Sequence, residues 1–326
     1  MKQKLRRWLE VLGGIAAVSL SAGCANFETT KAFASQGDRV TSSVKAELDF
    51  VSAECAKRDE VYALLLGKPG EANPMSVACQ ETDDALAQLS ESTLDLFSKY
   101  NQAIAALSDG SKYDLSGSFN STANKLKALK DKSGPVVRGE SVEVVLKAAN
   151  LLADVATSAI RNREMKRLLD AGGDDWPKVL SPLKTFFGPH AGNMTVQPSP
   201  YQVAVSALNG ADDAIRGFLR RKTGDKGGCL PVTGKDIECE PIRATELIAE
   251  ADARKKALAD RISADQSKPS KTAKSVQDAI DAWIQAHEAL RKDAFRLDPT
   301  QLWAQLQALK ARADELNDAI AARKKG

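Results

Sequence analysis

The sequence predicts an all-α protein, an elongated antiparallel helical bundle of about eight helices with coiled-coil-like heptad stripes. Three observations predict this fold class. Apolar residues recur at alternating steps of three and four along most of the 326 residues. Segments rich in Pro and Gly separate these stripes, as expected where the chain reverses. Alternation of polar and apolar residues is confined to one short candidate hairpin between Cys229 and Cys239.

The first predicted helical hairpin joins two long stripes through the Pro- and Gly-rich loop at 67–74. The upstream stripe consists of Phe33, Gly37, Val40, Val44, Leu48, Val51 and Cys55. The downstream stripe consists of Cys79, Thr82, Leu86, Leu89, Thr93, Leu96, Tyr100, Ala103 and Leu107. In an antiparallel pair of these helices, Cys55 and Cys79 face each other near one end.

Residues 142–160 are apolar around most of the helix circumference, so they are predicted to form the central helix of the bundle. Glu143, Lys147 and Asp154 argue against a membrane span there.

Further helices are predicted in the C-terminal half. Residues 241–262 have high helix propensity. Asp298 can cap the last helix, and Pro299 suits its first position. The apolar faces are Tyr201, Ala204, Leu208, Ala211, Ile215 and Phe218; Ala273, Val276, Ile280, Trp283, His287, Leu290 and Ala294; and Leu302, Leu306, Leu309, Ala313, Leu316 and Ile320.

A segment at 171–200 interrupts the helical pattern, because it carries five of the twelve prolines and no clear helix signal. We expect it to connect two helical halves, 24–170 and 201–326. Two interpretations stay open for its aromatic residues. They pack onto the bundle as a hinge, or they form a partner surface, for which the candidates are Trp176, Phe186, Phe187, His190 and Tyr201.

The N-terminus is typical of a targeting segment, with basic residues up to Arg7 followed by a short apolar run from Val11 to Leu20. Ser21 to Cys24, the stretch SAGC, resembles the lipobox of bacterial lipoproteins, although Ser21 stands where that family usually has Leu, Val or Ile. The resemblance implies that residues 1–23 are a signal peptide and that Cys24 is acylated. It also implies, with Ala25 rather than Asp after the cysteine, a place on the periplasmic face of an outer membrane.

The charge balance argues against a nucleic-acid partner. The whole chain has 46 Lys and Arg against 43 Asp and Glu. Four of the basic residues and one acidic residue lie in 1–23, so the remainder carries equal numbers of both kinds. The basic excess therefore belongs to the signal peptide.

Four cysteines follow Cys24, an even number in a segment expected to be exported, so two disulfides are expected among Cys55, Cys79, Cys229 and Cys239. All three pairings are open, and the pairing of sequence neighbours closes the shortest loops. No metal site is expected, because the cysteines lack C-x-x-C spacing and neither His190 nor His287 follows a Glu by three positions. His287 lies within an apolar stripe and is expected to be a hydrogen-bonded core residue. No cofactor motif is present.

One weak catalytic resemblance remains. Glu140 and Ser141 resemble the Glu-Ser pair of lytic transglycosylases, which cleave cell wall with a single glutamate. The glycine-rich motif of that family is missing downstream, and an acid in the first turn of a helix is also favoured by the helix dipole.

We therefore expect a non-enzymatic, lipid-anchored scaffold or binding protein of the bacterial cell envelope. Its expected partners are the membrane, through acylated Cys24, and an envelope protein, and self-association is compatible with the helical stripes. The alternatives are a cell-wall enzyme with His190 or Glu140 at its centre, and a bundle that holds an apolar small ligand near residues 142–160.

Overall fold

The computed structural model describes a chain that is almost entirely helical, which confirms the predicted all-α class. The described residues are 27–57, 90–110, 119–124, 147, 161–173, 175–188, 190–191, 196–197, 199–223, 241–262, 268–293 and 300–321. The helices are 27–57, the π-helical turn η1 (Ser90–Leu94), α3 (Asp95–Asp109), 119–124, α6 (Arg161–Gly172), α7 (Trp176–Val179), α8 (Ser181–Phe187), α9 (Pro200–Thr223), α10 (Pro241–Leu258), the 3-10 turn η2 (Ala259–Arg261), α11 (Lys271–Asp293) and α12 (Thr300–Ala321).

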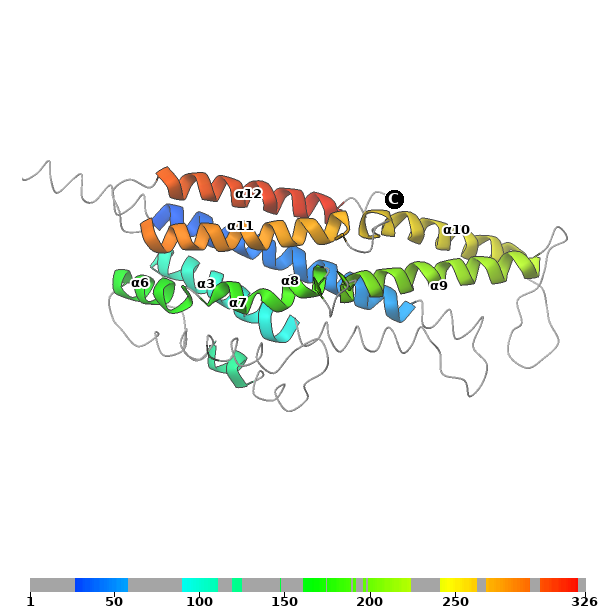
Figure 1. Cartoon of the computed structure of the whole chain (residues 1–326), viewed down its shortest axis with the longest axis horizontal. Helices are drawn as coiled ribbons and strands as arrows, with labels where there is room; N and C mark the ends of the chain where they lie inside the picture. Colours follow the sequence, from blue (N-terminus) through cyan, green and yellow to red (C-terminus); the bar gives the residue numbers. More distant parts are fainter. Residues whose placement is uncertain are drawn as a thin grey trace, which may run out of the picture.

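The helices lie along one long axis (Figure 1). Helix 27–57, α3, α11 and α12 form the main body, and α6, α7 and α8 follow one another along it. Helices α9 and α10 pair and continue past the end of the body, and we call this pair the α9–α10 arm. Helix 27–57, drawn in blue, begins at the opposite end of the long axis from the arm. The molecule is therefore elongated in its described part.

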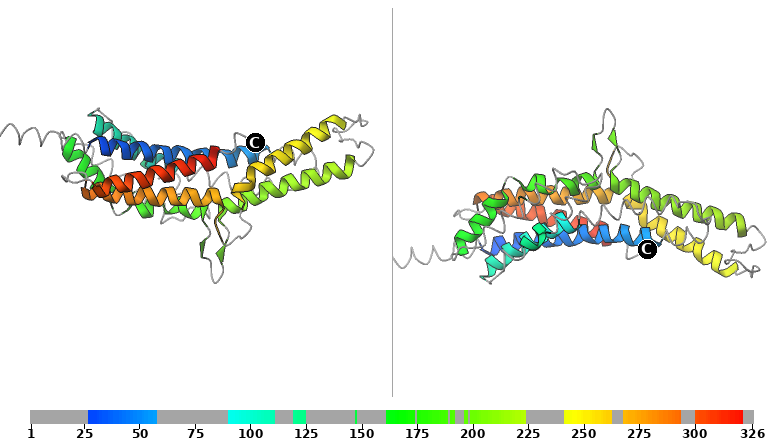
Figure 2. Two further views of the ribbon diagram at one scale, coloured as in Figure 1. Left: turned by 90° about the horizontal axis from the view of Figure 1, so that it is seen from above. Right: turned by 90° about the horizontal axis from the view of Figure 1, so that it is seen from below.

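A small antiparallel ribbon projects sideways from the helices (Figure 2). Its strands are β1 (His190–Ala191) and β2 (Val196–Gln197), and His190 pairs with Gln197. It is the one sheet within the described ranges.

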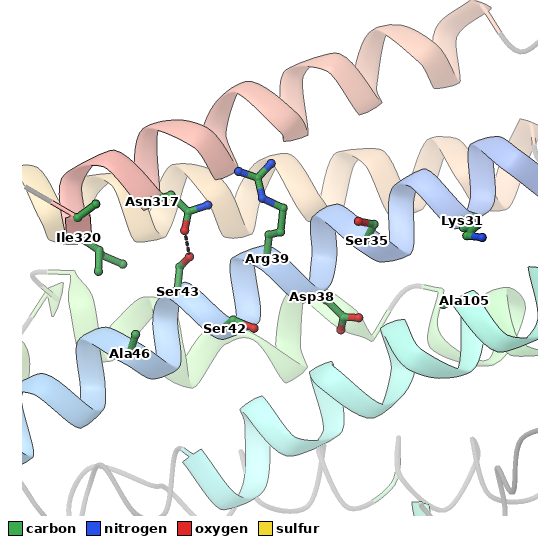
Figure 3. Close-up of a pocket in the computed structure, with 11 residues that line it drawn as sticks. Lys31, Ser35, Asp38, Arg39, Ser42, Ser43, Ala46, Ala105, Asn317 and Ile320 are labelled. Carbon is green, nitrogen blue, oxygen red and sulfur yellow. Dashed lines mark hydrogen bonds between the residues drawn. The ribbon is translucent and has the colours of Figure 1, made fainter.

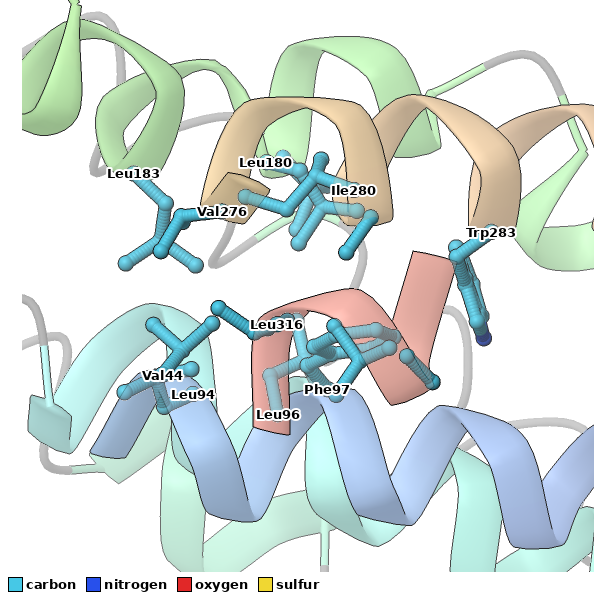
Figure 4. Close-up of a cluster of buried hydrophobic side chains, with 14 of the residues drawn as sticks. Val44, Leu94, Leu96, Phe97, Leu180, Leu183, Val276, Ile280, Trp283 and Leu316 are labelled. Carbon is cyan, nitrogen blue, oxygen red and sulfur yellow. The ribbon is translucent and has the colours of Figure 1, made fainter. Parts of the chain in front are cut away.

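The predicted apolar stripes form the core. All seven positions of the first stripe, Phe33 to Cys55, are buried. The structure describes the second stripe from Thr93 onward, and its five positions there are buried as well. The stripes of α9, α11 and α12 are likewise buried at their described positions. Figure 4 shows how side chains from helix 27–57, α3, α8, α11 and α12 meet in this core.

The core does not divide at the segment 171–200. One continuous cluster of buried apolar side chains contains residues from both expected halves, for example Phe33 and Tyr100 together with Leu208 and Trp283. The connecting segment contributes to the same cluster through α7 and α8.

The expectation that 171–200 lacks a clear helix is wrong. Pro177 and Pro182 lie in the first turns of α7 and α8. A proline is tolerated there because the first amides of a helix have no intrahelical acceptor. The prolines therefore start two short helices instead of preventing them.

Two glycines have specific roles in the packing. Gly110 adopts φ 72° and ends α3 in the left-handed conformation that favours glycine. Gly37 lies against α3, so that a Cβ atom there would overlap the side chain of Asn101. Thr41 donates to the carbonyl of Gly37 over 2.9 Å.

Several predictions lie outside the described residues. These are the signal peptide and Cys24, the helix at 142–160 apart from residue 147, the cap at Asp298, and Cys79, Cys229 and Cys239. Cys55 is buried and disulfide-bonded, but no disulfide has both cysteines in the described part of the chain, so the pairing stays a prediction. The number of helices and their arrangement as one bundle concern the whole chain and also stay predictions. Among the helices described, none combines the length and the apolar character that a membrane span needs.

Candidate functional site

The aromatic residues expected as a partner surface belong to the core instead. Trp176, Phe186, Phe187 and Tyr201 are each at most 1% exposed. Phe187 and Tyr201 pack with ring centroids 4.9 Å apart, and Phe186 contacts Phe187 edge to face. The partner-surface interpretation of these four residues is therefore wrong, because α7 and α8 turn their apolar faces onto α9 and α11. The side chain of His190 lies outside the described residues.

A second aromatic cluster surrounds His287, which is buried and hydrogen-bonded as predicted. Its ring stacks on Trp283 with centroids 5.2 Å apart, and its Nε2 lies 2.5 Å from the hydroxyl of Tyr100. Burial, with a smaller contribution from the positive charge of Arg291, lowers the pKa of His287 to about 3. The imidazole is therefore neutral at physiological pH and has no access to a solvent-borne substrate.

A buried ion pair joins helix 27–57 to the turn after α10. Arg261 donates from Nε and Nη2 to the two carboxylate oxygens of Glu47, over 2.6 and 2.7 Å. Tyr201 donates to the same carboxylate over 2.8 Å. Burial raises the pKa of Tyr201 well above its usual value, and the negative charge of Glu47 adds to this effect. Glu47, Arg261 and Tyr201 thus serve as one another's hydrogen-bond partners, and we call this structural group the buried clamp.

Ion pairs join the two helices of the α9–α10 arm. Arg254 lies 3.2 Å from the buried carboxylate of Asp212, Lys255 lies 2.5 Å from Asp213, and Arg216 lies 2.7 Å from Asp252. Ion pairs between neighbouring helices fix their register more than they add stability. The arm is thus a defined charged element that extends from the main body.

The candidate functional site is an open groove over helix 27–57, between α3 and α12, which we call the Asp38 groove (Figure 3). It has a volume of about 760 Å³. Successive turns of helix 27–57 supply its floor, and α3 and α12 supply its two walls. Its lining residues are Lys31, Ser35, Asp38, Arg39, Ser42, Ser43, Ala46, Ala105, Asn317, Ile320 and Ala321.

The polar side chains of the groove point in different directions. Arg39 points toward α12, where it forms an ion pair with Asp314 at 2.5 Å, and Ser43 donates to the amide oxygen of Asn317. Asp38 points toward α3 (Figure 3). Lys31 reaches the end of α3, where its ammonium group lies 2.8 Å from Asp109. Both basic residues of the groove are therefore already paired with carboxylates other than Asp38.

Asp38 itself is only partly buried, but its Oδ1 is shielded from solvent. Within the described part of the chain, it is the only buried carboxylate oxygen without a hydrogen-bond donor. Desolvation raises the pKa of Asp38 to about 6. A carboxylate of this kind favours a ligand that brings a proton donor or a positive charge.

The sequence analysis did not identify this groove. Asp38 follows Lys31 and Ser35 at steps of four and three, a spacing that also describes any solvated helix face. Nothing in the sequence separates Asp38 from Asp49, which is exposed and paired with Lys45 on the same helix. Only the positions of α3 and α12 distinguish them.

The other candidate chemistries gain no support from the described residues. Glu140 and Ser141, and the apolar helix proposed to adjoin a small ligand, lie outside them. The described residues contain no group of three or more His, Cys, Asp and Glu side chains arranged to hold a metal ion. Comparison with family models, with curated proteins and with solved structures finds no match for this chain.

Proposed function

We propose that this protein is a lipid-anchored helical scaffold of the bacterial cell envelope, an elongated antiparallel bundle of about eight helices that binds an envelope protein and is not an enzyme. In this proposal, Cys24 is acylated, residues 1–23 are then removed so that Cys24 becomes the new N-terminus, and the protein faces the periplasm from the outer membrane. Two disulfides among Cys55, Cys79, Cys229 and Cys239 stabilise it.

One observation carries the proposal: helix 27–57 begins at the opposite end of the long axis from the α9–α10 arm (Figure 1). Residue 27 follows Cys24 by three positions, so an anchor at Cys24 is attached close to one end of the body. Helix 27–57 spans about 45 Å at 1.5 Å for each residue, and α9 adds further reach. An anchored molecule can therefore hold the arm well away from the lipid surface.

The burial of the reactive side chains supports a binding role over catalysis. His287, Tyr100 and the Glu47–Arg261 pair contact one another or apolar neighbours in the interior, where no substrate can meet them. A general acid or base must reach the proton that it transfers. The arm, in contrast, exposes charged side chains such as Glu250 and Asp252.

The anchor is tested by fractionation of the native host. Wild-type protein is expected in the membrane fraction with a mass that includes acyl groups at Cys24. Cys24→Ser is expected to carry no acyl mass. Wild-type protein with an unmodified Cys24, or a Cys24→Ser variant that still carries acyl groups, contradicts the proposal.

The scaffold role is tested with photo-crosslinking residues in living cells. Positions Glu246 and Glu250 on the exposed face of α10 report on the arm, and Trp303, which is 46% exposed on α12, serves as a control on the body. We expect one discrete adduct from the arm positions, absent from position 303 and weakened in Cys24→Ser, which lacks the acyl anchor. Equal adducts from arm and body, or none from the arm, contradict the proposal.

A further inference from the structure

The Asp38 groove contains one charge that the protein does not balance. Lys31 is paired with Asp109 at 2.8 Å, and Arg39 is paired with Asp314 at 2.5 Å. Asp38 has neither an ion pair nor a donor to its buried Oδ1 among the described residues. The groove therefore offers an unpaired carboxylate, whereas its positive charges are already engaged.

The remaining lining restricts the size and polarity of a ligand. Ser35 and Ser42 lie one turn on either side of Asp38 and add hydroxyl groups of small volume. Ala46, Ala105 and Ile320 add apolar surface. A ligand that matches this lining has one cationic head, beside Asp38, and a short apolar body along the alanines.

We propose that the Asp38 groove binds an organic cation, a primary alkylammonium group that pairs with the carboxylate of Asp38 while its hydrocarbon part lies against Ala46, Ala105 and Ile320. An anionic ligand is disfavoured, because the unpaired carboxylate of Asp38 repels it and the two basic residues of the lining, Lys31 and Arg39, are already paired. A neutral alcohol lacks the charge that makes a buried carboxylate a strong partner. This inference does not depend on the lipid anchor or on the envelope partner.

The ionisation of Asp38 agrees with this assignment. Desolvation raises its pKa to about 6 in the empty groove, and a bound ammonium group lowers it again because opposite charge favours the ionised form. On α3 and α12, the carboxylates that contact residues lining the groove are Asp109 and Asp314, and they are paired with Lys31 and Arg39. Ligand affinity is therefore expected to fall about tenfold between pH 7 and pH 5.

Isothermal titration calorimetry of the full-length chain with hexylammonium chloride, with hexanol as the uncharged probe, tests the proposal. We expect saturable binding of hexylammonium at one site and no binding of hexanol. Asp38→Asn keeps the size of the side chain and is expected to weaken binding about tenfold or more. Asp49→Asn removes an exposed carboxylate from the same helix outside the groove and is expected to leave binding unchanged.

A second variant separates loss of the site from loss of the fold. Ser42 is exposed, and Ser42→Leu partly fills the groove without changing a charge. It is expected to weaken hexylammonium binding while the thermal midpoint stays as in the wild type. Equal binding of hexanol, or full hexylammonium affinity in Asp38→Asn or in Ser42→Leu, overturns the proposal.

An ammonium group can come from a free amine or from the headgroup of phosphatidylethanolamine. Flotation of the unanchored Cys24→Ala chain with vesicles of phosphatidylcholine, with and without phosphatidylethanolamine, distinguishes these sources. Preference for phosphatidylethanolamine that disappears in Asp38→Asn assigns the headgroup, and hexylammonium binding without this preference assigns a free amine. Absence of both overturns the proposal.

Discussion

The hydroxyl of Tyr100 on α3 and Nε2 of His287 on α11 lie 2.5 Å apart in the interior, although 187 positions separate them in the sequence. Trp283 packs against both rings, and its Nε1 donates to Oδ1 of Asn101 over 3.2 Å. The Asn101 side chain in turn faces Gly37 of helix 27–57. Two hydrogen bonds thus join α3 to α11 within the aromatic core, and helix 27–57 packs against the Asn101 side chain at Gly37.

The first prediction concerns acid stability. The folded protein holds His287 neutral down to about pH 3, whereas the unfolded chain takes up a proton near pH 6.5. Between these values the unfolded state binds more protons, so the free energy of unfolding decreases as the pH falls, by about 1 kcal/mol for each pH unit. Urea denaturation of wild type and His287→Gln from pH 7 to pH 4 measures this. His287→Gln is expected to be less stable at pH 7 but to lose less stability on acidification, and parallel pH profiles would refute the assignment.

The second prediction concerns the buried clamp. Glu47→Gln leaves Arg261 as an uncompensated buried charge and is expected to reduce the free energy of unfolding by about 3 to 5 kcal/mol. Replacement of both partners, as Glu47→Leu with Arg261→Met, is expected to cost much less, because no charge then remains buried. Asp49→Asn, which removes one partner of the exposed Lys45–Asp49 pair, is the control and should change stability by less than about 1 kcal/mol. If Glu47→Gln proved as stable as Asp49→Asn, Arg261 would not be a desolvated charge.

Two glycines provide a matched test of helix packing. Gly37→Ala introduces a methyl group into the side chain of Asn101 and is expected to destabilise the protein by about 1 to 3 kcal/mol. Gly210→Ala on α9 meets open space and is expected to stabilise it by about 0.5 to 1 kcal/mol, because alanine favours the helix. Thermal unfolding followed by circular dichroism at 222 nm reports both. Shifts of the same sign would contradict the close approach at Gly37.

The fourth prediction distinguishes core from surface aromatics. Trp176→Ala and Phe187→Ala are each expected to cost about 3 to 5 kcal/mol, because they empty space inside the core. Trp303→Ala, at a side chain that is 46% exposed, should change the thermal midpoint little. A folded Trp176→Ala protein with unchanged stability and lost partner binding would restore the partner-surface interpretation.

The described core was predictable from the sequence to a large extent. The stripes from Phe33 to Cys55 and from Leu302 to Ile320 are buried as their spacing indicated, because a helix places residues three and four apart on one face. The burial of His287 followed from its place in such a stripe. The segment 171–200 was less predictable, because a proline can end a helix or begin one, and the following residues decide which.

Neither the buried clamp nor the candidate site was predictable. Glu47 and Arg261 are 214 positions apart, and no local pattern indicates that they meet. Asp38 and Asp49 lie on one helix with similar neighbours, yet α3 and α12 flank the part of the helix that carries Asp38, whereas Asp49 is exposed. Desolvation of a carboxylate depends on what the rest of the chain places around it, so it has no signature in the helix that bears it.

The sequence by itself determined which faces the long described helices bury, because hydrophobic periodicity and helix propensity act over a few residues. The stretch before Cys24 also predicts a lipid-anchored location, which stays a prediction. Only the tertiary structure decided which polar residues are clamped in the interior, which aromatics belong to the core, and which carboxylate stays without a partner in a groove. These outcomes depend on contacts between helices distant in the chain, and the free energy of each buried group is set by those contacts.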